Sequence, residues 1–82
     1  MNTSVVSPPQ ARARGLEFLA DAFVVHLADG RSLTVPLEWF PRLRDASSEQ
    51  RSHWRFVGSG SGIHWPDIDE DISVAGLLGL PD

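Results

Sequence analysis

Residues 14–36 alternate between apolar and polar side chains, with a break at Asp21-Ala22 and a turn signal at Asp29-Gly30. This pattern predicts β-strands joined by tight turns. A two-residue loop would place the apolar side chains of the last two strands on opposite faces, which is costly. A three-residue loop, Ala28 to Gly30, with a left-handed glycine avoids that conflict and predicts a bulged hairpin. One face then carries Phe23, Val25, Leu27, Leu33 and Val35, and His26 lies on the other.

After Pro36 the spacing of apolar residues changes from two to three. Proline lacks the donor that a continuing strand needs, so the strand should end there. Leu37, Phe40 and Leu43 recur every third residue, which predicts a short helix bent at Pro41. Residues 47–50 read Ser-Ser-Glu-Gln, a capping-box pattern that predicts a second short helix running toward residue 53.

The last third of the chain predicts another hairpin and a closing helical turn. Residues 54–58 and 62–66 read as short strands around a glycine-serine turn, and Ser73 is suited to cap a helix over residues 74–78. The whole pattern indicates an α+β fold: an antiparallel sheet of about four to five strands, a meander with the bulged hairpin, covered by short helices. Residues 1–13 read as a flexible tail and 14–82 as a single domain. Large aromatic side chains bury much area, so Trp39, Trp54 and Trp65 are expected in the core.

Composition narrows the classes of function. The chain has 82 residues, no cysteine and a net charge of −4, so disulfides and cysteine-ligated zinc are absent. It shows neither a signal peptide nor a membrane span, which predicts a cytoplasmic protein. All seven basic residues are arginines before residue 56, and residues 56–82 carry five acids and no base. An acidic chain without lysine disfavours direct nucleic-acid binding.

Segment 63–73 carries the densest set of candidate chemical groups. Asp67, Asp69 and Asp71 alternate, and His64 precedes them, so an extended chain would direct three carboxylates to one side. A calcium loop starting at Asp67 would need glycine and glutamate where Ile72 and Leu78 stand. A solvated loop or a set of acids preceding the last helix is favoured, and no metal is predicted. The alternative is a metal-assisted hydrolase that uses His64, Asp67, Asp69 and Asp71.

The arginines from Arg42 to Arg55 form a second candidate cluster, beside two tryptophans. Arginine with tryptophan is typical of binding hot spots in protein interfaces. The same guanidinium groups are equally suited to pair with the acidic segment inside the molecule. An alternative function is a nucleic-acid-associated regulator that uses these arginines. The cluster consists of Arg42, Arg44, Arg51 and Arg55.

Residues 16–79 resemble a bacterial family, the domain of unknown function numbered 2442. The resemblance rests on Asp29-Gly30-Arg31, Pro36-Leu37, Trp39-Phe40-Pro41-Arg42-Leu43, Arg51, Trp54, Gly62-Ile63-His64-Trp65-Pro66, Asp69-Glu70-Asp71-Ile72-Ser73 and Gly76-Leu77-Leu78. It implies an α+β fold with an antiparallel sheet and a short stand-alone protein, often encoded near a small toxin-like or mobile-element gene. It supplies no catalytic residue.

These observations predict a non-enzymatic protein-interaction module that needs no cofactor. The expected role is antitoxin-like or inhibitor-like, with a basic protein partner such as a toxin or a defence nuclease component. Neither nucleic acid nor membrane is an expected partner, and a homodimer stays an alternative. The predicted partner-binding residues are Trp39, Arg42, Arg44, His64, Trp65, Asp67, Asp69, Glu70 and Asp71.

Overall fold

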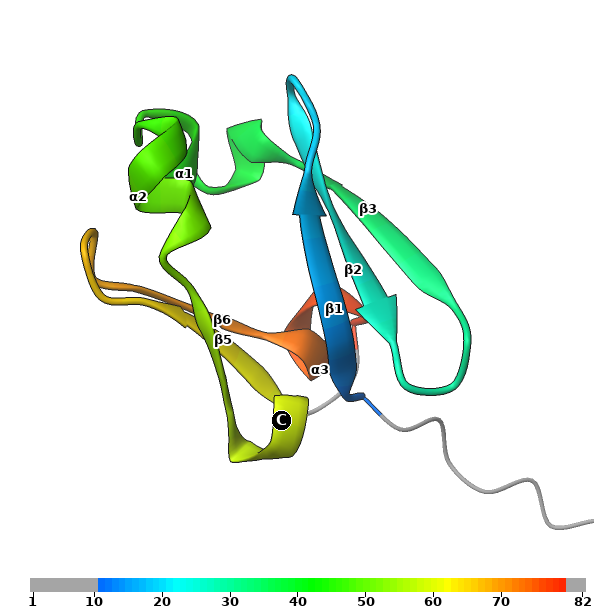
Figure 1. The fold of residues 1–82 in the computed structure, drawn as a ribbon. Coiled ribbons are helices and arrows are strands. Elements are labelled where there is room, and N and C mark those ends of the chain that lie inside the picture. Colours follow the sequence, from blue (N-terminus) through cyan, green and yellow to red (C-terminus); the bar gives the residue numbers. More distant parts are fainter. Residues whose placement is uncertain (1–10, 80–82) are drawn as a thin grey trace, which may run out of the picture.

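The computed structural model describes residues 11–79 and confirms an α+β fold (Figure 1). The predicted tail lies outside the described residues up to residue 10, but Ala13 already belongs to the first strand and is buried. In chain order the elements are β1 Ala13–Phe18, β2 Ala22–Leu27, β3 Ser32–Pro36, the 3-10 helix η1 Leu37–Trp39, α1 Pro41–Arg44, α2 Ser48–Ser52, β4 Arg55–Val57, the 3-10 turn η2 Gly58–Gly60, β5 Gly62–Trp65, β6 Glu70–Ser73 and α3 Val74–Leu77.

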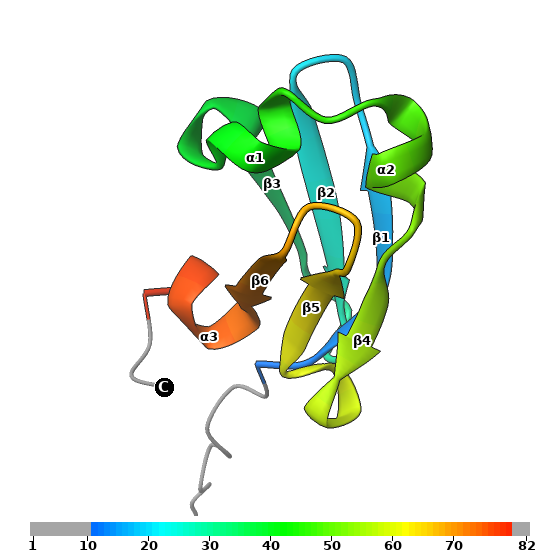
Figure 2. The same ribbon diagram turned by 90° about the vertical axis from the view of Figure 1, so that its left-hand side faces the viewer.

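The strands form two sheets, which corrects the prediction of one sheet of four to five strands. Within the described residues the orders are β1-β2-β3 and β4-β5-β6, and all neighbours are antiparallel. Figures 1 and 2 show the second sheet lying over the first, with α1 and α2 closing one end. Each sheet has one apolar face. Packing these two faces together buries both, whereas pairing the sheets edge to edge would leave both exposed.

The bulged hairpin between β2 and β3 is confirmed. Phe23 pairs with Val35 and Val25 with Leu33, as the three-residue loop requires. The amide of Leu27 donates to the carbonyl of Arg31 at 2.8 Å, which closes the loop. Gly30 has a φ of +96°, in the left-handed region that glycine adopts without steric cost.

Strand β6 was not predicted, because residues 70–73 read as acids preceding a helix. In the structure they pair with β5, with Ile72 opposite Ile63 and Asp71 opposite His64. In a segment of four residues, the alternation of apolar and polar side chains is too short to predict a strand. The turn at residues 66–69 reverses the chain and brings β6 alongside β5.

The short helices have the predicted starts. Ser47 Oγ accepts from the Gln50 amide at 3.0 Å, and the Ser47 amide donates to Gln50 Oε1 at 2.9 Å, which is the predicted capping box. Ser73 Oγ likewise accepts from the Gly76 amide at 3.1 Å and caps α3. Pro41 is the first residue of α1, where its missing donor costs nothing.

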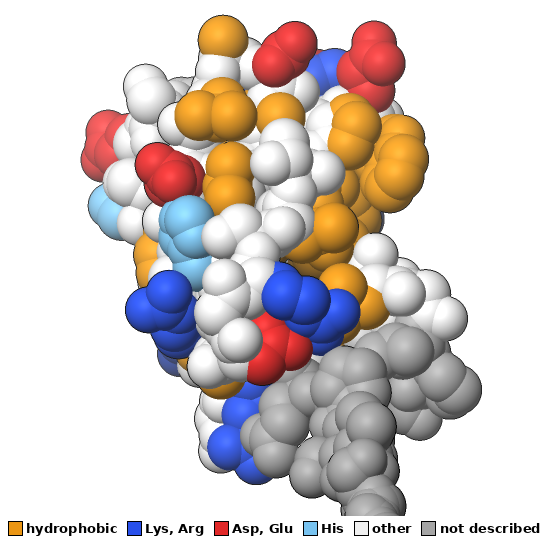
Figure 3. Space-filling view, turned by 90° about the vertical axis from the view of Figure 1, so that its right-hand side faces the viewer, with side chains coloured by type: hydrophobic (Ala, Val, Ile, Leu, Met, Phe, Trp, Pro, Cys, Tyr) orange, Lys and Arg blue, Asp and Glu red, His pale blue; other side chains and the backbone are white. Residues whose placement is uncertain are grey.

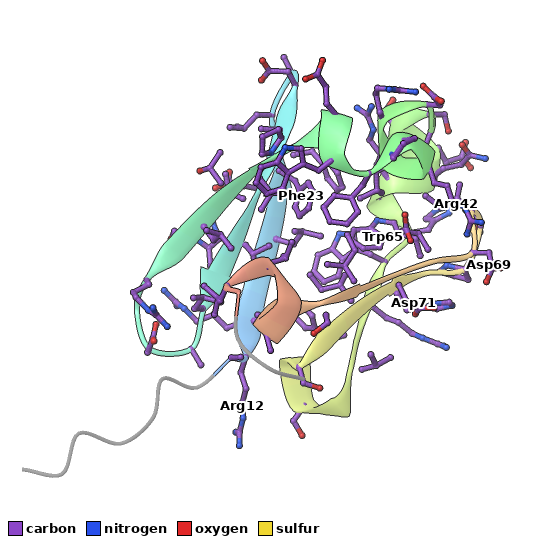
Figure 4. The ribbon with its side chains drawn as sticks, turned by 180° about the vertical axis from the view of Figure 1, so that it is seen from behind. Arg12, Phe23, Arg42, Trp65, Asp69 and Asp71 are labelled. Carbon is purple, nitrogen blue, oxygen red and sulfur yellow. The ribbon has the colours of Figure 1, made fainter. Side chains whose placement is uncertain are left out.

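The core lies between the two sheets, and Trp65 is at its centre (Figure 4). Its ring makes edge contacts with Phe18 and Phe23, at centroid distances of 6.4 and 6.5 Å, so it joins β5 to the opposite sheet. The expectation that all three tryptophans build the core is wrong for Trp39, which is 66 % exposed, while Trp54 is half-buried. Propensity and spacing do not tell which face of a three-residue helix meets the core.

Arg51 ties α1, α2 and the core together. Its Nε donates to the Leu43 carbonyl at 2.9 Å and its Nη2 to the Arg44 carbonyl at 2.8 Å. The Arg51 carbonyl in turn accepts from the indole nitrogen of Trp65 at 3.1 Å. No helix within residues 11–79 has the length and hydropathy needed to cross a bilayer.

Candidate functional site

Two of the predicted site residues, Trp39 and Asp71, line a groove of about 250 Å³ beside β6. One wall of the groove comes from η1 and the other from β6 and α3, so segments distant in sequence build it together. Trp39 is the most exposed large hydrophobic side chain among the described residues and borders the groove. The lining residues are Trp39, Phe40, Asp71, Ile72, Ser73, Gly76 and Leu77.

The turn before β6 is fixed by Arg42, which comes from α1. The Nη1 of Arg42 donates to the backbone carbonyl of Asp69 at 2.5 Å, and Figure 4 shows the two residues side by side near that turn. The bond uses the backbone and not the carboxylate of Asp69, so it leaves that carboxylate exposed toward solvent. The prediction that arginines pin the acidic segment therefore holds for Arg42 alone.

Two aspartates of the acidic segment are each paired with a different histidine. His64 Nδ1 lies 2.6 Å from Asp71 Oδ1, and His53 Nδ1 lies 2.7 Å from Asp67 Oδ2. The turn breaks the alternation on which the predicted carboxylate row depended. Within residues 11–79 no three histidines or acids gather in a group able to hold a metal ion. The ligand set on which the hydrolase alternative relied is therefore separated.

The outer face of the second sheet carries a row of three charged or titratable residues. Arg55 on β4 is opposite His64 on β5, which is opposite Asp71 on β6. Cross-strand neighbours on one face lie within about 5.5 Å at Cβ, so His64 is within reach of both Arg55 and Asp71. The His64 side chain is 19 % exposed, whereas that of Asp71 is 71 % exposed and remains available to a partner.

Two arginines of the cluster make contacts within the chain. Arg44 pairs with Asp45 at 3.0 Å, and this hydrogen bond raises the pKa of Arg44 and lowers that of Asp45. The Arg51 side chain donates hydrogen bonds to two backbone carbonyls. Its guanidinium also lies 5.9 Å from the centre of the Phe18 ring. Both guanidinium groups therefore already have hydrogen-bond partners within the chain.

One predicted residue, Trp65, needs a correction of role, and some groove residues were missed. Trp65 has no exposed surface and cannot touch a partner in this conformation, because it fills the core. Glu70 is half-buried, and its Oε1 accepts from the Asp71 amide at 3.1 Å. Phe40, Ile72 and Leu77 line the groove but were expected only as core or connecting residues. No local sequence signal distinguishes them.

The outer face of the β1-β2-β3 sheet also carries a histidine with polar neighbours. Figure 3 shows the face of the β1-β2-β3 sheet, where a histidine lies among acidic and basic side chains. His26 there contacts Ser32 Oγ and Glu17 Oε1, both at 2.9 Å. Both ring nitrogens of His26 therefore have polar partners on this face.

A second hollow of about 540 Å³ lies across β6 from the groove. Its lining includes Val57, Gly62, Asp71 and Ala75, and it also reaches Ala11, where the described residues begin. Asp71 borders both hollows and therefore stands on the ridge between them.

Asp69 has a φ of +52°, in the left-handed region of the backbone. A substitution that removes its charge should therefore use a side chain that tolerates this conformation. Asparagine tolerates the left-handed region, whereas other side chains pay about 1–2 kcal/mol there. We expect Asp69→Asn to leave the free energy of unfolding nearly unchanged and Asp69→Gln to lower it by about 1 kcal/mol. Both remove the same charge, so urea denaturation of the two variants isolates the backbone effect. Equal stabilities would contradict the left-handed conformation.

Fold and site define a small α+β protein with a composite acidic and aromatic surface and, among the described residues, no assembled metal site. Residues 13–80 match the family described as "Protein of unknown function (DUF2442)", and the chain belongs to that family. None of the curated proteins compared with the chain matches it.

Two solved structures are similar over most of this chain. One is a protein of unknown function from Rhodospirillum rubrum, with a TM-score of 0.71 and 29 % identity, covering 84 % of this chain and 87 % of that one. The other is an uncharacterized protein from Chromobacterium violaceum, with a TM-score of 0.70 and 26 % identity, covering 83 % of this chain and 64 % of that one. Both support the fold and neither describes a function.

Proposed function

We propose that this protein is a non-catalytic interaction module that binds a basic partner protein through the surface around β6. We call Trp39, His64, Asp69, Asp71 and Leu77 the β6 surface. The observation that carries the proposal is the exposure of Trp39 beside a groove whose rim bears the exposed carboxylate of Asp71. Tryptophan is strongly enriched in binding hot spots, and here 66 % of its surface is exposed and not part of the core.

Charge favours a basic partner. Residues 56–82 contain five acids and no base, and the side chains of Asp69 and Asp71 are exposed on the β6 surface. Complementary charge speeds encounter and excludes wrong partners. An antitoxin-like or inhibitor-like role follows if the partner's basic surface is its own functional site, because a small acidic domain seated there would block it.

The expected result of a pull-down from the native host, with the tagged full chain at moderate salt, is one stoichiometric partner. Trp39→Ala should lower its recovery at least about tenfold, as loss of a hot spot does. Leu19→Ala is the matched control, since Leu19 is also exposed but lies in the turn between β1 and β2.

A second pair of variants tests the charges. Asp69→Asn with Asp71→Asn should reduce recovery and weaken its salt dependence, because long-range attraction is lost. The control variant, Asp21→Asn with Glu49→Gln, also removes two negative charges, but from exposed positions away from β6. It should have little effect on recovery of the partner. Identical recovery with all four variants, or no stoichiometric partner at all, would overturn the proposal.

A further inference from the structure

We propose that the groove beside Trp39 receives an arginine side chain of the partner. The inference rests on the proposed function and names the partner group that this surface recognises. Three properties of the groove support it: its size, the chemistry of its walls and the engagement of this chain's own nearby arginines.

The size of the groove suits a single side chain. Its volume of about 250 Å³ falls below the roughly 300–1,000 Å³ typical of small-molecule sites. The groove is also open to solvent along Trp39, so a side chain can enter it while its backbone stays outside. A cofactor-sized ligand would not be enclosed.

The walls of the groove match the parts of an arginine. Its floor includes Ile72 and Leu77, which offer apolar contact to the methylene stem. The exposed ring of Trp39 is suited to stack on a planar guanidinium. Asp71 on the rim has a 71 % exposed side chain and provides the opposite charge. His64 contacts Oδ1 of Asp71, and each carboxylate oxygen can accept a second bond.

Lysine fits these walls less well. Its ammonium is a strongly hydrated point charge that neither stacks on an indole nor bonds a carboxylate through two parallel donors. A flat ring beside a carboxylate therefore favours guanidinium over ammonium.

The arginines of this chain near the groove are held by other contacts. Arg42 binds the carbonyl of Asp69, Arg44 pairs with Asp45, and Arg51 bonds the carbonyls of Leu43 and Arg44. No arginine is among the described residues that line the groove, so the partner would supply the cation that the groove accommodates.

The test uses the full chain and three blocked tripeptides, acetyl-Gly-Xaa-Gly-amide, with arginine, lysine or the neutral isostere citrulline as Xaa. Titrations are followed by two-dimensional amide and indole NMR. The arginine peptide should produce saturable shifts of the Trp39 indole and the Asp71 amide, with a Kd on the order of 1–10 mM for so small a ligand. We expect the lysine peptide to bind about fivefold more weakly and the citrulline peptide not to saturate.

Variants separate this inference from the proposed function. Trp39→Ala should abolish the shifts at Asp71, Asp71→Asn should weaken binding about fivefold, and Leu19→Ala should leave it unchanged. Equal affinity for arginine and lysine, or no saturable shift at Trp39 with the arginine peptide, would overturn the inference. A pull-down partner that still depends on Trp39 would in that case leave the proposed function standing.

Discussion

Replacing Trp65 by alanine is expected to unfold most of the protein at room temperature. Trp65 has no exposed surface, and its ring contacts Phe18 and Phe23 on the opposite sheet. Truncating a buried tryptophan to alanine costs about 3–5 kcal/mol. The single core of a domain this small supplies only about 3–5 kcal/mol in total. Far-ultraviolet circular dichroism with urea denaturation should show little or no folded baseline for this variant.

Trp39→Ala is the matched control for Trp65→Ala, because the chemical change is the same at an exposed position. With 66 % of Trp39 exposed, we expect it to cost less than about 1 kcal/mol and to keep a cooperative transition. Comparable destabilisation by the two variants would contradict the assignment of Trp65 to the core and Trp39 to the surface. The same result decides whether Trp39→Ala can be used in binding experiments.

Trp65→Phe probes how the core is connected. It keeps an aromatic ring between the sheets but loses the hydrogen bond from the indole nitrogen to the Arg51 carbonyl. Leaving that acceptor without its partner should cost about 1–3 kcal/mol. A folded but weakened protein is therefore expected, with stability between those of the original chain and Trp65→Ala.

Gly60→Ala is expected to cause the second large loss of stability. Gly60 has a φ of +94°, and an added Cβ would lie within 2.4 Å of the Ala13 carbonyl oxygen. That oxygen belongs to the backbone of β1, so one of the two sheets must move away from the other. We expect the left-handed backbone to cost about 1–2 kcal/mol and the overpacking about 1–3 kcal/mol more. Thermal unfolding followed by circular dichroism should show a correspondingly lower Tm.

Gly30→Ala separates these two contributions. Gly30 has nearly the same φ, +96°, but an added Cβ meets nothing within 4 Å. Only the backbone cost should remain, so the difference between the two variants reports the contact between η2 and β1. If Gly30→Ala were as destabilising as Gly60→Ala, the close approach at Ala13 would be refuted.

Local features of the fold could be predicted from the sequence. The bulged hairpin followed from keeping Phe23, Val25 and Leu33 on one face, and the capping box followed from Ser47 and Gln50. Each depends on residues close in the chain, so spacing and side-chain chemistry determine the result. The family resemblance was also carried by local motifs and is confirmed over residues 13–80.

The candidate site was only partly predictable for the same reason. Trp39 and Asp71 were singled out by residue type, and both line one groove in the structure. Their companions Phe40 and Leu77 could not be identified, because nothing local distinguishes a side chain that lines a groove from one that fills a core. Trp65 was assigned to the site on its type alone, although packing places it in the interior.

The sequence by itself therefore determined the hairpins, the caps, the short helices and the uneven distribution of charge, all of which arise within a few residues. Tertiary structure decided that the strands form two sheets, that residues 70–73 become β6, and that Trp39 and not Trp65 faces solvent. Each of these outcomes depends on which apolar faces bury one another. That choice is made by free energy summed over contacts between residues far apart in the chain, which no local pattern records.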